Sequence, residues 1–158
     1  KGDGMMRMLV GVLTVGVFLG FGFTPTRIAS DVPLQDRAVQ PPGEDVPKDL
    51  AAFSGRWVGV WTDGRNYRKN MALVIERLIL PDRATGYYGC GHALPVANPV
   101  CPSAFAVSGQ LEGGILKIAY PAIRANGRYR VVDGALKGEL VDAASGKLLI
   151  WVTATRLP

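Results

Sequence analysis

The chain contains few of the residues from which catalytic and metal centres are usually built. Its 158 residues include one histidine, His92, and two cysteines, Cys90 and Cys101. A single histidine excludes any site that needs several, and two cysteines cannot form a dense disulfide scaffold. No serine lies in the Gly-x-Ser-x-Gly context of a hydrolase nucleophile, and no pair of carboxylates is recognisable as a general acid and base. The sequence therefore predicts no catalytic residue, no metal and no cofactor.

A strong bias in charge is also missing. The chain has 18 Lys and Arg against 13 Asp and Glu, for a formal net charge of +5. Nucleic-acid binding usually shows a larger, clustered basic excess, so no nucleic-acid partner is expected. Arg124, Arg128 and Arg130 would form a basic stripe, able to hold an anion or an acidic partner, if they lay on one unbroken strand. The turn-forming dipeptide Asn126-Gly127 between them favours an ordinary exposed face instead.

The longest uncharged apolar run lies at residues 8–23. Arg7 precedes it, and the small residues of Ile28-Ala29-Ser30 follow it. This order is typical of a secretory signal peptide, which we place at residues 1–30. Sixteen residues with four glycines are short for a membrane-spanning helix, which needs ~20 apolar residues. We therefore predict a periplasmic or secreted protein. The alternative is an uncleaved inner-membrane anchor, with the following domain outside the cytoplasm.

The composition then changes twice along the chain. Residues 31–52 contain four prolines and seven charged residues but no aromatic residue. Such a stretch has little apolar surface to bury, and it predicts an extended Pro-rich linker. From Gly55 onward the pattern repeats every second residue, which is the period of a β-strand. We therefore assign residues 53–158 to a single β-barrel domain.

Short turns separate about eight segments of strand character in this domain. Asp133-Gly134 gives the clearest hairpin signal. Consecutive strands joined by short turns pair antiparallel, and about eight of them can close into a small barrel, which removes exposed edges. We therefore predict an all-β fold, in which an antiparallel up-and-down meander closes as a small barrel after an N-terminal apolar signal helix. The alternative is an open sandwich. The predicted strands are residues 55–62, 71–80, 84–91, 103–110, 115–120, 128–132, 135–141 and 147–157.

Five aromatic residues fall at positions predicted to face the barrel interior. Rings of this size stabilise a small core, so core packing is one interpretation of all five. An eight-stranded barrel holds either packed side chains or one small ligand. The other interpretation is therefore a ligand site lined by Trp61, Tyr88, Tyr129 and Trp151, with Trp57 as the fifth inward ring.

Two motifs at the ends of the strand pattern resemble those of a known group of barrels. Gly55-Arg56-Trp57 opens the first predicted strand, and Arg156 lies at the end of the last. This arrangement is similar to that of the calycin-type barrels, the lipocalins and avidins. The resemblance implies that the Arg156 guanidinium packs across the Trp57 indole where the first and last strands close the barrel. The wider pattern resembles an uncharacterised group of exported bacterial barrel domains and consists of Trp57-x-Gly59-x-Trp61, Leu73-Val74-Ile75-Glu76-Arg77, Gly86-Tyr87-Tyr88-Gly89, Leu136-Lys137-Gly138 and Arg156.

Cys90 lies just before the longest predicted loop, at residues 92–102, and Cys101 lies near the end of that loop. In an oxidising compartment Cys90 and Cys101 are expected to form a disulfide, which removes the thiolate. Two alternatives remain open at this point. Cys90 and His92 could act as a nucleophile and its base, or Cys90, His92 and Cys101 could supply three ligands to zinc.

These observations favour an exported, non-enzymatic small β-barrel that binds a small molecule or a cell-envelope component. One alternative is an inhibitor of a periplasmic or secreted enzyme such as a protease, with residues 31–50 entering the enzyme's cleft. A second alternative is a hydrolase-type enzyme that uses His92 beside a carboxylate. Membrane contact is expected only through residues 8–23, if that segment is not removed.

Overall fold

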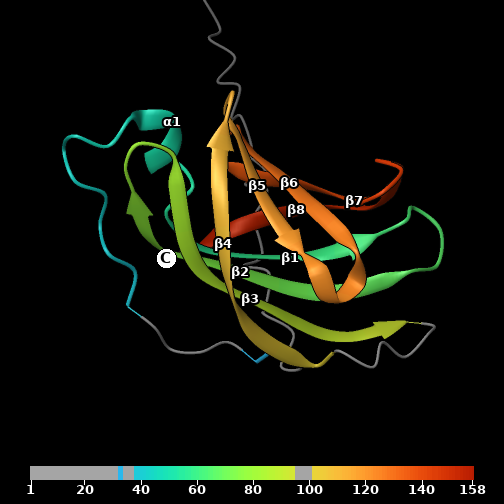
Figure 1. The fold of residues 1–158 in the computed structure, drawn as a ribbon. Helices are drawn as coiled ribbons and strands as arrows, with labels where there is room; N and C mark the ends of the chain where they lie inside the picture. The colour runs from blue at the N-terminus through green and yellow to red at the C-terminus, as the bar shows by residue number, and fades with distance from the viewer. Residues whose placement is uncertain (1–31, 34–37, 95–100) are drawn as a thin grey trace, which may run out of the picture.

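The computed structural model describes residues 32–33, 38–94 and 101–158, and the predicted signal helix lies outside them. In this part of the chain, eight strands follow one another with two short helices (Figure 1). None of the helices described is long and apolar enough to cross a membrane. The elements are α1 (Lys48–Ala51), β1 (Gly55–Thr62), β2 (Arg68–Ile79), β3 (Arg83–Leu94), β4 (Ser103–Glu112), β5 (Ile115–Tyr120), the 3₁₀ turn η1 (Pro121–Ile123), β6 (Ala125–Val132), β7 (Ala135–Asp142) and β8 (Leu148–Leu157).

The sheet closes on itself. Each strand pairs antiparallel with the next, and β8 pairs with β1, so the order around the barrel is the order in the sequence. The predicted closed meander is therefore confirmed, and the sandwich alternative is wrong. Side chains that alternate along the strands point inward and fill the core, as do Trp57, Leu73, Leu116, Tyr129 and Leu136, all of which are fully buried.

One end of the barrel is plugged by the segment that precedes β1. Leu50 of α1 and Phe53 are buried against the interior, and the indole Nε1 of Trp57 donates a hydrogen bond to the Phe53 carbonyl oxygen at 2.9 Å. The Arg156 guanidinium carbon lies 4.6 Å from the centroid of the Trp57 ring, and Arg156 also donates to the carbonyl of Ala52. The expected contact between the first and last strands is therefore present, and it closes this end of the barrel.

The dipeptide Asn126-Gly127 is not a turn, and this part of the prediction is wrong. Gly127 lies inside β6, where a Cβ atom would come within 2.6 Å of the Tyr129 ring and 2.8 Å of the Tyr120 ring. The glycine is needed to make room for two buried rings, because their side chains occupy the space above its backbone. The chain reverses earlier, at η1, and Arg124 follows it in the left-handed region with φ 50°.

Two points of the predicted linker, Val32 and Gln40, lie against the outside of the barrel. Val32 is buried beside Val58 and Ala72 on the outer faces of β1 and β2. The backbone N–H of Gln40 donates to the carbonyl of Glu76 at 2.9 Å. These contacts place two points of the segment on the barrel wall, although its composition alone predicted little burial.

Candidate functional site

A cavity of about 350 Å³ lies at the end of the barrel opposite α1. Its volume falls in the range of small-molecule sites, ~300–1,000 Å³. The lining is almost entirely apolar and comes from β1 to β5, β7 and η1. The residues that form it include Trp61, Lys69, Tyr88, Cys90, Cys101, Phe105, Val107, Tyr120, Ala122, Ile123 and Leu140.

The cavity reaches the barrel wall where β4 and β5 separate. The ladder between them joins Gly109–Glu112 to Ile115–Ile118. Beyond this ladder β4 continues along β3, and β5 continues along β6, so that the two strands diverge from their shared hairpin (Figure 1). Ala106 of β4 and Ala119 of β5 are exposed on the outside and yet line the cavity. The site is therefore open between these two strands.

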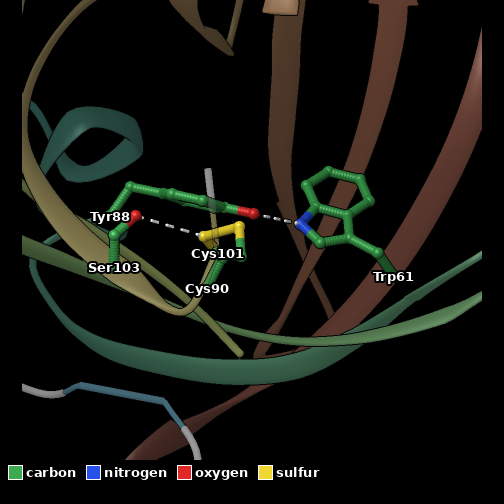
Figure 2. Close-up of a disulfide and its surroundings, with 5 residues drawn as sticks. All are labelled: Trp61, Tyr88, Cys90, Cys101 and Ser103. Carbon is green, nitrogen blue, oxygen red and sulfur yellow. Dashed lines mark hydrogen bonds between the residues drawn. A yellow bond between two sulfur atoms is a disulfide. The ribbon is translucent and has the colours of Figure 1, made fainter. Parts of the chain in front are cut away.

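Aromatic rings from three strands form one wall of the cavity. The Tyr88 ring centroid lies 5.3 Å from that of Phe105 and 5.2 Å from that of Tyr120. Trp61 Nε1 donates a hydrogen bond to the Tyr88 hydroxyl oxygen at 2.8 Å, as Figure 2 shows. Beneath this wall the hydroxyls of Tyr120 and Tyr129 share a hydrogen bond of 2.7 Å. The rings are therefore held in fixed positions by contacts with one another.

The buried tyrosines remain protonated over the physiological pH range. Burial raises the pKa of Tyr88 and of Tyr120 well above the ordinary value, because the phenolate would lose its hydration. The Tyr88 oxygen already accepts from Trp61, and among the described residues its own proton has no acceptor. Tyr88 can therefore donate a hydrogen bond to a molecule in the cavity.

Lys69 is the charged residue of the lining. It is only 5% exposed and lies opposite Trp61 in the β1–β2 ladder. Burial lowers the pKa of its ammonium group, and in the described ranges no carboxylate lies within ion-pair distance of it. A buried charge without a counterion is costly, and an opposite charge nearby stabilises it. The cavity is thus an apolar site with one ammonium group that an anion would stabilise.

The disulfide borders the same cavity. Cys90 and Cys101 are bonded, with their Cα atoms 5.6 Å apart, and Cys90 Sγ lies 3.7 Å from the Ser103 hydroxyl oxygen (Figure 2). The predicted disulfide is therefore confirmed. Since both thiols are used in the bond, the Cys90–His92 nucleophile and the three-ligand zinc site are wrong. The bond joins Cys90, inside β3, to Cys101, two residues before β4 begins.

The four proposed ligand-lining residues do not share one site. Trp61 and Tyr88 line the cavity, whereas Tyr129 is buried beneath it in the packed core. Trp151 is wrong as an inward residue, because it is 40% exposed on the outer face of β8. The buried Val152 and Ala154 face inward on this strand together with Arg156, which reaches Trp57. Trp151 is an odd number of positions from each of them and must face outward.

Sequence reasoning missed Lys69, Phe105 and Tyr120 as lining residues. Lys69 could have been found, because it continues the alternation of Met71, Leu73 and Ile75 by one more step along the same face. The second predicted strand began at Met71, whereas β2 begins at Arg68. Phe105 and Tyr120 became lining residues because β4 and β5 diverge beside them, and no local sequence signal marks that divergence.

No protein-family model and no curated protein matches the chain. Among solved structures, the chain is similar to a zebrafish ileal bile acid-binding protein crystallised with cholic acid, at 17% sequence identity and a TM-score of 0.37. The match covers 67% of this chain and 99% of that chain. The assignment of the barrel rests on the strand pairing described above.

Proposed function

We propose that this chain is an exported, non-enzymatic β-barrel that binds one small hydrophobic molecule carrying an acidic group. The observation that carries the proposal is Lys69, which is buried in the lining of an apolar cavity and has no carboxylate within ion-pair distance among the residues that the structure describes. The acidic group accepts hydrogen bonds from the Lys69 ammonium and the Tyr88 hydroxyl. The apolar part of the ligand lies against Phe105, Tyr120 and Ile123.

Both parts of the ligand are needed for the energetics to work. The apolar part gains about 25 cal/mol for each Å² that it removes from water. The acidic part must lose its own hydration, and the Lys69 charge compensates for that loss because the two attract strongly where water is excluded. An uncharged molecule of the same shape leaves Lys69 without a partner. The cavity is therefore expected to prefer the acid.

Export is the second part of the proposal. It is supported by the apolar run at residues 8–23 and by the disulfide, a bond that oxidising compartments favour. Intact-mass analysis of the protein recovered from its own cells tests it. A chain that begins near Asp31 is the expected result, and a mass that includes residues 8–23 would favour the membrane anchor.

A non-enzymatic role is supported by the state of the groups in the site. The sulfur of Cys90 is bonded to Cys101, and the raised pKa values keep Tyr88 and Tyr120 protonated. The inhibitor alternative required an N-terminal arm that projects from a plugged barrel. Val32 and Gln40 instead lie on the barrel wall, and the disulfide end contains a cavity.

Two probes that share a ring system test the site. 1-Anilinonaphthalene-8-sulfonate carries one acidic group, and N-phenyl-1-naphthylamine is its uncharged equivalent. We expect the full-length chain to bind the sulfonate more tightly and Lys69→Met to reverse the preference, with at least a roughly tenfold loss for the sulfonate. Equal affinity of the wild type and Lys69→Met for the sulfonate would contradict the role of Lys69.

A matched pair of tryptophan substitutions locates the binding. Ala122 lines the cavity from η1, whereas Ala144 is exposed in the β7–β8 turn at the same end of the barrel and is not part of the lining. Ala122→Trp should abolish binding of both probes by filling the cavity mouth, and Ala144→Trp should leave it unchanged. If both variants bind both probes like the wild type, the probes bind elsewhere and the proposed site is wrong.

A further inference from the structure

The outer surface of β5, β6 and β7 carries a patch of basic side chains that the cavity does not use. It consists of Lys117, Arg128, Arg130 and Lys137, which we call the basic face. Lys117 lies directly opposite Arg128 in the β5–β6 ladder, and Arg130 lies directly opposite Lys137 in the β6–β7 ladder. All four are exposed. Of the predicted stripe, Arg128 and Arg130 do lie on one strand, because β6 runs through Asn126-Gly127, whereas Arg124 precedes β6 and is not part of it.

Internal ion pairs neutralise this face only in part. Lys117 forms a salt bridge with Glu112. In the part of the chain that the structure describes, Arg128, Arg130 and Lys137 have no ion-pair partner, although Glu139 lies opposite Arg128. Like charges on directly opposed strand positions destabilise a sheet. An external anion would remove that repulsion, so the face is complementary in charge to an anionic surface.

Exposed apolar side chains border the same cations. Trp151 lies opposite Glu139 in the β7–β8 ladder and is 40% exposed, and Leu148 and Val132 are exposed as well. These three residues and the four cations line one surface groove. Tryptophan and aliphatic residues beside Lys and Arg are typical of segments that lie in a membrane interface.

We propose that the basic face docks the barrel onto a bilayer that contains anionic phospholipids. The cations meet lipid phosphates, and Trp151 and Leu148 enter the headgroup region. A soluble polyanion would satisfy the arginines but would leave the aliphatic side chains in water, so the combination favours a bilayer. This contact is separate from residues 8–23 and from the cavity, and it does not depend on the proposed function.

Tryptophan fluorescence of the full-length chain reports this docking directly. The chain has three tryptophans; Trp57 and Trp61 are buried, so Trp151 is the one that lipid can reach. Vesicles of phosphatidylcholine alone are compared with vesicles that also contain phosphatidylglycerol, with brominated acyl chains as quenchers. We expect a blue shift and quenching that require phosphatidylglycerol and weaken as salt is added. Residues 8–23 contain no tryptophan, so the emission itself comes from the barrel domain.

Matched charge variants decide the outcome. R128Q/R130Q/K137Q should bind phosphatidylglycerol vesicles roughly tenfold more weakly or worse. K48Q/R77Q, which removes two exposed cations that do not line this groove, should bind like the wild type. Quenching in neutral vesicles, or equal quenching in all three proteins, would overturn the proposal. If R128Q/R130Q/K137Q loses heparin binding and no vesicle quenches Trp151, the partner is a soluble polyanion and the bilayer proposal is wrong. Thermal melts of each variant confirm that it is folded.

Discussion

Replacing Arg156 by methionine tests the closure of the barrel. The substitution keeps the apolar stem but removes the guanidinium that lies 4.6 Å from the Trp57 ring centroid and donates to the Ala52 carbonyl. A cation–π contact at an exposed residue contributes ~0.5–1 kcal/mol, and a hydrogen bond contributes about 1 kcal/mol net. We therefore expect Arg156→Met to lower the free energy of unfolding by about 2 kcal/mol.

Urea unfolding followed by circular dichroism measures this loss. With a slope of about 2 kcal/mol per molar urea, the midpoint should fall by about 1 M. Arg156→Lys keeps the charge but not the flat guanidinium, so its loss should be intermediate. Arg77→Met, at an exposed position of β2, is the matched control and should shift stability by less than about 0.5 kcal/mol. If Arg156→Met behaves like Arg77→Met, the closing contact does not stabilise the barrel.

Three further predictions concern the core and the cavity. Reduction of the Cys90–Cys101 disulfide should lower the melting temperature and cost about 2–3 kcal/mol by the chain-entropy estimate for so short a loop; no change in the melt would contradict it. Gly127→Ala should destabilise the fold by ~1–3 kcal/mol, because the new methyl group meets the Tyr129 ring. A loss below about 0.5 kcal/mol in urea unfolding would mean that the ring moves aside freely. Burial lowers the pKa of Lys69 in the folded state, so the unfolded chain binds the Lys69 proton more tightly than the folded chain does. Without ligand, the free energy of unfolding should therefore rise with pH between the lowered pKa and the ordinary value of 10.5. Thermal melts should show Lys69→Met more stable than the wild type at neutral pH, with a difference that shrinks towards pH 10.5; a difference independent of pH would contradict the assignment.

Much of the fold could be predicted because short-range patterns determine it. Alternation of apolar residues located the strands, and the Asp133-Gly134 hairpin is present because both residues have positive φ, 51° and 75°. The closing contact of Trp57 with Arg156 followed from a resemblance at the two ends of the pattern. These features depend on residues close in sequence or on a motif at a known position in the barrel.

The errors occurred where a distant side chain decides the local structure. Asn126-Gly127 is a strong turn signal by itself, but the ring of Tyr129 requires the glycine inside a strand. Trp151 was placed inward, although an inward Arg156 on the same strand requires the opposite parity. Lys69 was left outside the second strand because the polar pair Lys69-Asn70 precedes the apolar run that begins at Met71. The burial of Lys69 depends on the neighbouring strand β1, in which Trp61 lies directly opposite it.

The separation of β4 from β5 has a consequence for how fast a ligand exchanges. A fully hydrogen-bonded barrel releases a molecule from its interior only when strands break apart, but here the wall beside Ala106 and Ala119 is already parted. β4 remains paired with β3 along its length and is joined to it near one end by the disulfide at Cys101. The width of the opening therefore changes when the stretch of β4 beside Ala106 bends, together with β3, away from β5. The time that a ligand stays in the cavity should therefore depend on how freely this stretch of β4 bends. Breaking the disulfide should raise the rate at which the ligand leaves, while most of the contacts that hold the ligand are kept.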